Sequence, residues 1–247
     1  METASATDAV DVAAPVPGVA SDAFSWKSDM AESSEYLSTQ LITYLGNKRA
    51  LLDFIGRGVN AVRKLIGRDR LVMFDAFSGS GVVSRYFRQY ASRIHVNDIE
   101  EYAEVISRCY MTDVASVDLD ALNDSHSRLR AALTSDHLRP GFIADMYAPR
   151  DDSAIVPGER CFYTRRNAMY LDTARMLIGE LPASMQPLFL APLLAEASIH
   201  ANTSGVFKGF YKDASGVGRF GGHNRDALTR ILGEIHVQLP VFSRFSC

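Results

Sequence analysis

The sequence predicts an α/β fold, with one doubly wound half followed by a mainly helical region. Two short apolar runs, residues 70–77 and 92–100, each precede a segment whose apolar residues recur at helical spacing. A glycine-rich loop, "FSGSG", follows the first run, and "NDIE" ends the second. Strands that alternate with helices in this order form parallel sheets with right-handed crossovers.

The first helix of this half is predicted to run from Lys48 to Gly67. Apolar residues between 51 and 66 recur at helical spacing, and Asn47 is a favourable N-cap. Glycine commonly ends a helix because it adopts the left-handed conformation without strain.

The first strand is predicted within 70–77, "RLVMFDAF", where the apolar run is continuous. A continuous run is typical of a parallel strand buried on both faces. A helix over 82–90, a second strand within 92–100 and a helix over 102–110 follow by the same reasoning.

Beyond about residue 115 the pattern indicates helices without strands. Thr164 and Ser184 are candidate N-caps of two of these helices, and Pro192 is expected to kink or shorten the last one. The predicted helices cover residues 118–134, 164–180 and 185–201.

The net charge of −3 is unevenly distributed. Residues 1–35 hold seven acidic residues against one lysine, and the remainder is mildly basic. Residues 1–34 are rich in Ala, Ser, Asp and Val without periodicity, so we expect a disordered acidic leader. A mildly basic body permits a polyanionic partner.

Composition also narrows the class of protein. The three cysteines form no close pair, which suits a reducing compartment, and no zinc cluster or other metal site is expected. No apolar run reaches the roughly 18–20 residues of a membrane span, and the start of the chain lacks the pattern of a signal peptide. We therefore expect a cytoplasmic protein.

The glycine-rich loop and the acidic strand end should form one ligand site, because both lie at the carboxyl edge of a parallel sheet. Ser84 stands where a dinucleotide fingerprint has its third glycine. Asp75, at the entrance of the loop, is unfavourable for a pyrophosphate and favourable for a cationic ligand. S-adenosylmethionine carries a sulfonium, an ammonium and a ribose without phosphate. These residues leave a nucleotide and S-adenosylmethionine both open.

Three motifs in order, "YLGNKRALLDFI", "FDAFSGSG" and "NDIE", resemble adenine-specific DNA N6-methyltransferases of the Dam-like class. The similarity continues through "CFYTRRNAMYLDTAR" and "AEASIHANTSGVFKGFYKD", and covers about residues 40–247. The resemblance implies the Rossmann-like fold of S-adenosylmethionine-dependent methyltransferases. It also implies that the protein methylates adenine in double-stranded DNA.

The resemblance also implies the cofactor-binding residues. Tyr44, Gly46 and Lys48 would line the methionine end of S-adenosylmethionine. The loop that starts at Asp75 would surround its amino-acid and sulfonium parts, and Asp98 would bind the ribose. The full set implied is Tyr44, Gly46, Asn47, Lys48, Asp75, Ala76, Phe77, Ser78, Gly79, Gly81, Asn97, Asp98 and Ile99.

The catalytic motif of this family, Asp/Asn/Ser-Pro-Pro followed by an aromatic residue, has no counterpart in the sequence. All nine prolines are isolated. The order of motifs in the family places "PVFSRFSC" at the run-up to that motif, so later strands of the sheet would be missing too. We therefore expect an incomplete sheet, no catalytic residue in this chain, and a heterodimer whose second subunit supplies the motif. A non-catalytic DNA- or cofactor-binding protein and a truncated fragment are the alternatives.

The resemblance divides the chain into the leader (1–34), a cofactor-binding half (35–115) and a region for DNA recognition and partner contact (116–247). Within the last, the glycine-rich stretch 203–225 interleaves basic and aromatic residues, a pattern suited to phosphate contact and base stacking. A flexible loop whose aromatics pack into the core is the alternative. The candidate DNA-binding residues are Asn202, Lys208, Lys212, Arg219 and Arg225.

Overall fold

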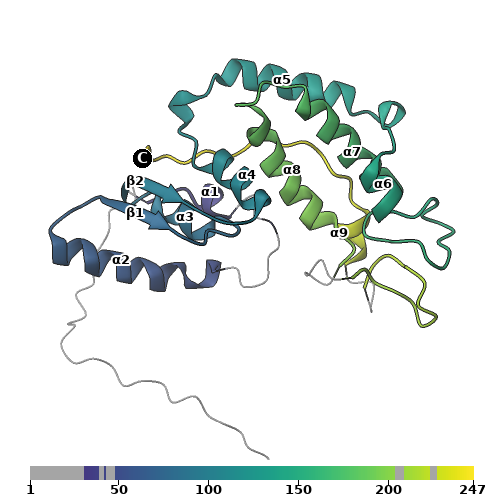
Figure 1. Cartoon of the computed structure of the whole chain (residues 1–247), viewed down its shortest axis with the longest axis horizontal. Coiled ribbons are helices and arrows are strands. Elements are labelled where there is room, and N and C mark those ends of the chain that lie inside the picture. Colours follow the sequence, from purple (N-terminus) through teal and green to yellow (C-terminus); the bar gives the residue numbers. More distant parts are fainter. Residues whose placement is uncertain (1–30, 39–41, 43–47, 204–208, 223–226) are drawn as a thin grey trace, which may run out of the picture. The chain divides into compact units, whose positions relative to one another are not determined.

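A computed structural model describes residues 31–38, 42, 48–203, 209–222 and 227–247 (Figure 1). Residues 31–247 form one unit. The division into leader, cofactor half and helical region stays a prediction, and most of the leader lies outside the described residues.

The sheet of the described part has two parallel strands, β1 (Leu71–Asp75) and β2 (Ala91–Val96), with Asp75 opposite Val96 at the carboxyl edge. Helix α3 (Val82–Phe87) connects them and packs on both. The predicted order of elements is therefore confirmed.

Helix α2 begins later than predicted. A 3-10 turn covers Arg49–Leu51, and the α-helix runs over Leu52–Ile66. The expected N-cap, Asn47, lies outside the described residues. Gly67 ends the helix in the left-handed conformation, with φ of 64°, as predicted.

The burial expected for β1 is wrong. Val72 and Phe74 are 67% and 65% exposed, while their neighbours along the strand are half-buried. In the described residues β1 pairs with β2 alone, so its other edge and the face that carries Val72 and Phe74 are uncovered. A continuous apolar run predicts burial only where a complete sheet surrounds the strand.

The helices beyond β2 pack mainly on one another. Contacts join α4 to α8, α7 to α6 and α8, α5 to α7, and α8 to α9. The helices predicted over 102–110, 118–134, 164–180 and 185–201 are confirmed, whereas α1, α6 and α9 were not predicted. The bounds are α1 Ser34–Ser38, α4 Glu101–Tyr110, α5 Leu119–Ala132, α6 Phe142–Tyr147, α7 Arg165–Gly179, α8 Gln186–His200 and α9 Leu228–Leu232, with 3-10 turns at Val114–Ser116 and Ser135–His137.

The N-cap predicted for α7 is confirmed, whereas two predictions for α8, its N-cap and its shortening at Pro192, are wrong. Thr164 caps α7, because its hydroxyl accepts a hydrogen bond from the Asn167 N–H at 3.2 Å. Ser184 does not cap α8, whose N-cap is Met185. Pro192 does not shorten α8 either, since the helix continues through it and the ring is fully buried.

Both ends of the described chain pack against the sheet half. Glu32 is buried, and its carboxylate accepts hydrogen bonds from the Ser243 hydroxyl and the Arg244 N–H. Arg70, just before β1, donates to the Ser246 carbonyl at 2.7 Å. The described residues therefore include Glu32, which falls within the segment expected as the leader. None of the helices in the described ranges has both the length and the apolar character needed to cross a membrane.

Candidate cofactor cleft and DNA-contact residues

The carboxyl end of β1 opens on a cleft of about 590 Å³. Three segments that are distant in the sequence meet there: Lys48 and Ile55, before and within the first turn of α2, the loop from Asp75 to Ser80, and Asp98 after β2. The structure thus brings together the glycine-rich loop and the acidic strand end that the sequence predicted to be one site.

Two glycines give the loop its path. Gly79 and Gly81 have φ values of 52° and 74°, a conformation that strains residues with a Cβ. The Gly81 N–H donates to the Ser78 carbonyl at 2.8 Å, which closes a turn immediately before α3. A Cβ at Gly81 would also lie 3.2 Å from Cγ2 of Ile106, so the turn is packed as well as bent.

Asp98 holds the loop in place. Its Oδ2 accepts a hydrogen bond from the Gly79 N–H at 2.7 Å, and its Oδ1 accepts one from the Glu100 N–H at 3.1 Å. The hydrogen bond from Gly79 is the main reason that the pKa of Asp98 is lowered. The sequence placed Asp98 beside the loop but gave no sign that it bonds to it.

Asp75 is fixed at the mouth of the cleft. The Ser84 hydroxyl donates to Asp75 Oδ2 at 2.5 Å, and the Phe77 N–H lies 3.4 Å from Oδ1. Ser84 is fully buried and orients the carboxylate of Asp75. It does so from the position that a dinucleotide-binding fingerprint gives to its third glycine. A negative charge fixed at this point disfavours a phosphate.

The cleft retains hydrogen-bonding groups for a ligand. The Ser78 hydroxyl is buried in its wall without a partner in the described part of the chain. The carboxylates of Asp75 and Asp98 keep spare acceptor positions, since each oxygen can accept two hydrogen bonds. An unpaired buried hydroxyl, two acids and one lysine suit a ligand that carries ammonium, hydroxyl and carboxylate groups.

Not every predicted cofactor residue lines this cleft. The Asn97 side chain donates to the Ala76 carbonyl at 3.0 Å and braces the loop from outside, while Ile99 is 94% exposed. Gly81 shapes the turn behind the cleft. Tyr44, Gly46 and Asn47 lie outside the described residues. The sequence reasoning missed the apolar wall of the cleft, which comes from the helices α2 and α3 and from strand β1: Ile55, Val82, Val83, Phe87 and Phe74.

The candidate DNA-binding residues fall into three groups. Asn202 is fully buried, and its amide donates to the carbonyls of Cys161 and Arg219 and accepts from the Gly221 N–H. This gives Asn202 a structural role, because no part of it is exposed to DNA. Lys212 is exposed, and Arg219 is half-buried with a hydrogen bond to the Gly222 carbonyl. Lys208 and Arg225 lie outside the described residues.

Comparison with known proteins agrees with the motifs in the sequence. A type II methyltransferase of Neisseria lactamica, M.NlaIII, is 28% identical over 178 residues, which cover 70% of this chain and 50% of that relative. The chain thus spans about half the length of the curated relative it matches. No solved structure matches the chain significantly. The model of the D12 class of N6 adenine-specific DNA methyltransferases, which use S-adenosylmethionine, matches residues 44–214. The chain belongs to this D12 family.

Proposed function

We propose that this chain is the S-adenosylmethionine-binding subunit of a DNA adenine N6-methyltransferase, and that a second chain supplies the catalytic motif. The cleft at the carboxyl end of β1 carries the first part of the proposal. There Asp75, the unpaired Ser78 hydroxyl and Asp98 face one cavity together with Lys48.

Each group in the cleft matches a part of the cofactor. Lys48 pairs with the carboxylate of the cofactor, and Asp75 pairs with its cationic amino-acid end. The ribose hydroxyls donate to the acceptor positions of the Asp98 carboxylate that the N–H groups of Gly79 and Glu100 leave free. When bound, S-adenosylmethionine supplies an electrophilic methyl group on a sulfonium.

The acceptor side of the reaction needs groups that lie elsewhere. The lone pair of the adenine amino group is delocalised into the ring, so hydrogen-bond acceptors must localise it before the nitrogen can attack. The base must also be flipped out of the duplex and stacked. In the family these tasks fall to the Pro-Pro motif, and the printed sequence contains no Pro-Pro pair.

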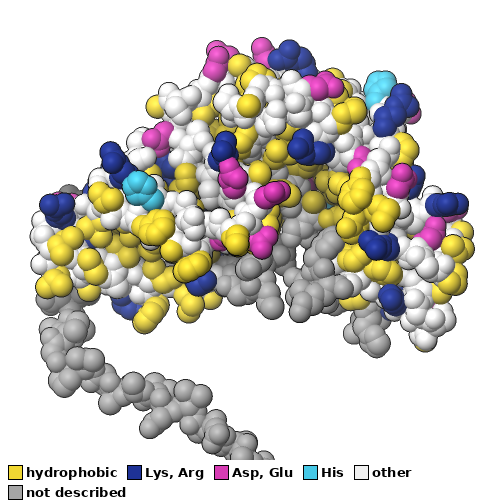
Figure 2. Space-filling view, viewed as in Figure 1, with side chains coloured by type: hydrophobic (Ala, Val, Ile, Leu, Met, Phe, Trp, Pro, Cys, Tyr) yellow, Lys and Arg dark blue, Asp and Glu magenta, His cyan; other side chains and the backbone are white. Residues whose placement is uncertain are grey.

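The side of the sheet that the described residues leave uncovered favours the binding of a second chain. Phe54 and Leu65 on α2 are 68% and 85% exposed, and Val72 and Phe74 on β1 are exposed as well. Figure 2 shows hydrophobic side chains gathered over α2 and the sheet. An unpaired strand edge beside exposed apolar side chains favours pairing with another strand.

Binding of S-adenosylmethionine tests the proposal. The chain would be co-purified with a chain that carries an Asp-Pro-Pro-Tyr motif, and the affinity of the complex measured by equilibrium dialysis. Asp98→Ala should weaken binding about tenfold or more, because hydrogen bonds to a charged group are lost. Asp98→Asn, which keeps an oxygen for the Gly79 N–H, should lie between.

Asp120→Ala serves as the control, because Asp120 is an exposed acid on α5, outside the cleft. It should leave the affinity unchanged. An unchanged affinity in Asp98→Ala, with the thermal stability of the complex intact, would show that the ribose does not lie at Asp98.

A further inference from the structure

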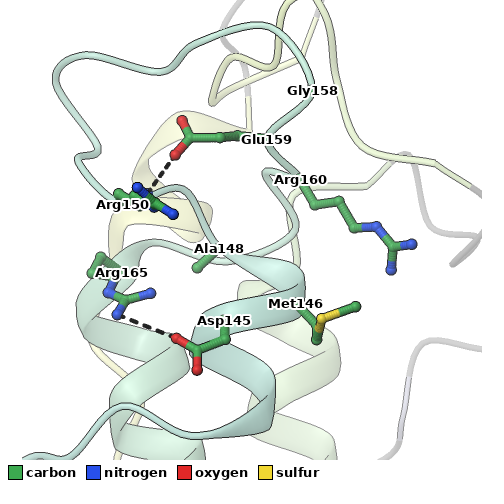
Figure 3. A pocket seen from close by; sticks show the side chains of 8 residues that line it. All are labelled: Asp145, Met146, Ala148, Arg150, Gly158, Glu159, Arg160 and Arg165. Atoms are coloured by element: carbon green, nitrogen blue, oxygen red, sulfur yellow. Dashed lines mark hydrogen bonds and ion pairs between the residues drawn. The ribbon is translucent and has the colours of Figure 1, made fainter.

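A second cleft, of about 780 Å³, lies between α6 and the loop that leads into α7 (Figure 3). Three arginines line it: Arg150, Arg160 and Arg165. The sequence analysis placed these residues in the region for DNA recognition and partner contact but named none of them as a DNA contact, and the methyl-donor cleft does not include them.

The two acids of this cleft are engaged by its own backbone and by Arg165. The Glu159 carboxylate accepts hydrogen bonds from the N–H groups of Val156 and Arg150, both at 3.0 Å, and these bonds lower its pKa. Asp145 lies 3.6 Å from the Arg165 guanidinium, which also donates to the Ala144 carbonyl. Glu159 thus shapes the loop, and Asp145 and Arg165 largely offset each other.

Arg150 and Arg160 differ from Arg165 in this respect. Both are exposed, and neither guanidinium forms a hydrogen bond or close ion pair with a carboxylate within the described ranges. Arg160 lies over the ring of Tyr147, with its guanidinium carbon 5.4 Å from the ring centroid, which orients the side chain without neutralising it. With three arginines and two acids the cleft has a net charge of +1, and the charge of Arg150 acts on Glu159. Arg150 and Arg160 are the two exposed guanidiniums that no hydrogen bond or close ion pair ties to an acid of the described part.

An aromatic row joins this cleft to the basic hairpin of residues 209–222. Tyr147 packs edge-on against Phe162 at 5.6 Å, and Phe162 packs edge-on against Phe210 at 5.1 Å. Lys212 lies over Phe210 at 5.2 Å, so Arg160 and Lys212 stand at opposite ends of one row. The contacts between these rings therefore connect the cleft to the hairpin, with one cation over each end of the row.

We propose that this cleft binds the phosphodiester backbone of duplex DNA through Arg150 and Arg160, and that it extends the contact made by Lys212. The planar guanidinium matches phosphate oxygens in a two-pronged hydrogen bond, which makes arginine a preferred phosphate contact. The inference rests on the proposed function in taking DNA as the substrate, and adds a binding site away from the methyl donor.

The test measures binding of the full chain to a fluorescent duplex of arbitrary sequence by anisotropy, without cofactor, over a series of KCl concentrations. Each phosphate contact contributes about 0.9 to the slope of log K against log salt. The double substitution Arg150→Gln and Arg160→Gln should lower that slope by about 2 and weaken binding at low salt. Arg150→Gln alone, which leaves the Arg160–Tyr147 contact intact, should lower it by about 1.

The control is Arg128→Gln with Arg130→Gln on α5, which removes the same charge from exposed positions outside the cleft. It should leave the slope unchanged. An equal loss in the control, an unchanged slope in both cleft variants, or no DNA binding by the wild-type chain would overturn the inference. The assay uses no S-adenosylmethionine, so failure of the methyl-donor cleft would appear in the dialysis experiment and not here.

Discussion

The sheet half of this chain, residues 48–100, and the helical half, residues 101–247, differ in how they bury apolar side chains. The main core is built by α4 to α8, where residues such as Phe189 and Ile178 are fully buried. No residue of β1 is buried, and α2 exposes Phe54 and Leu65. The helical half supplies most of the main core, whereas the sheet half holds the candidate cofactor cleft on two strands that the described residues leave uncovered on one side.

Substitution of one aromatic residue in each half tests this difference, and we expect the largest change in the free energy of unfolding from this pair. Phe189→Ala removes a fully buried ring and should lower the free energy of unfolding by about 3–5 kcal/mol. Phe74→Ala, on the exposed face of β1, should change it by less than about 0.5 kcal/mol. Urea unfolding of the isolated chain measures both, and a large loss for Phe74→Ala would show that β1 is covered.

The next effect concerns Asn202, which joins segments within the helical half. Asn202→Ala should cost about 2–3 kcal/mol, because the carbonyls of Cys161 and Arg219 and the Gly221 N–H lose a buried partner. Lys212→Gln should leave stability unchanged and weaken DNA binding. Urea unfolding and anisotropy measure the two effects. Unchanged stability and weaker DNA binding in Asn202→Ala would show that Asn202 is a DNA contact.

The outcome at Asn202 illustrates what sequence patterns reveal. The strands and the longer helices were predictable because apolar periodicity reflects the path of one segment. The end of α2 at Gly67 and the turn at Gly81 were predictable because glycine is the residue that adopts a positive φ without strain. Helix α6 is as short as α3, which was predicted, and its apolar residues follow the same spacing, so the signal for α6 was present and was missed. The exposure of β1 depends on neighbours distant in the sequence, which no local pattern encodes. The hydrogen bond between Ser84 and Asp75, nine residues apart, depends on how the loop between them folds back.

A smaller effect is expected from two glycines of the sheet half. Gly81→Ala should destabilise the chain by about 1–2 kcal/mol, because its φ of 74° is strained for alanine and the Cβ crowds Ile106. Gly58→Ala, in α2 with open space around it, should stabilise by about 0.5–1 kcal/mol. Urea unfolding measures both, and equal effects would mean that the turn before α3 is not constrained.

The smallest effect is the pH dependence contributed by Asp98. Its pKa in the folded protein lies below the ordinary value of 3.8, so the ionised form is stabilised by folding. That contribution is present above the ordinary value and is lost as pH falls through the lowered pKa. The midpoint temperature of thermal unfolding should therefore fall more steeply for the wild type than for Asp98→Asn between about pH 6 and pH 3. Parallel curves would contradict the bond to Gly79.

Transfer of a labelled methyl group from S-adenosylmethionine to adenine in duplex DNA tests the central claim most directly. The purified chain alone should transfer no label. Addition of a chain that carries an Asp-Pro-Pro-Tyr motif should produce N6-methyladenine, and Asp98→Ala should reduce that product. Robust methylation by the purified chain alone would contradict the account, because the acceptor groups would then lie within this sequence.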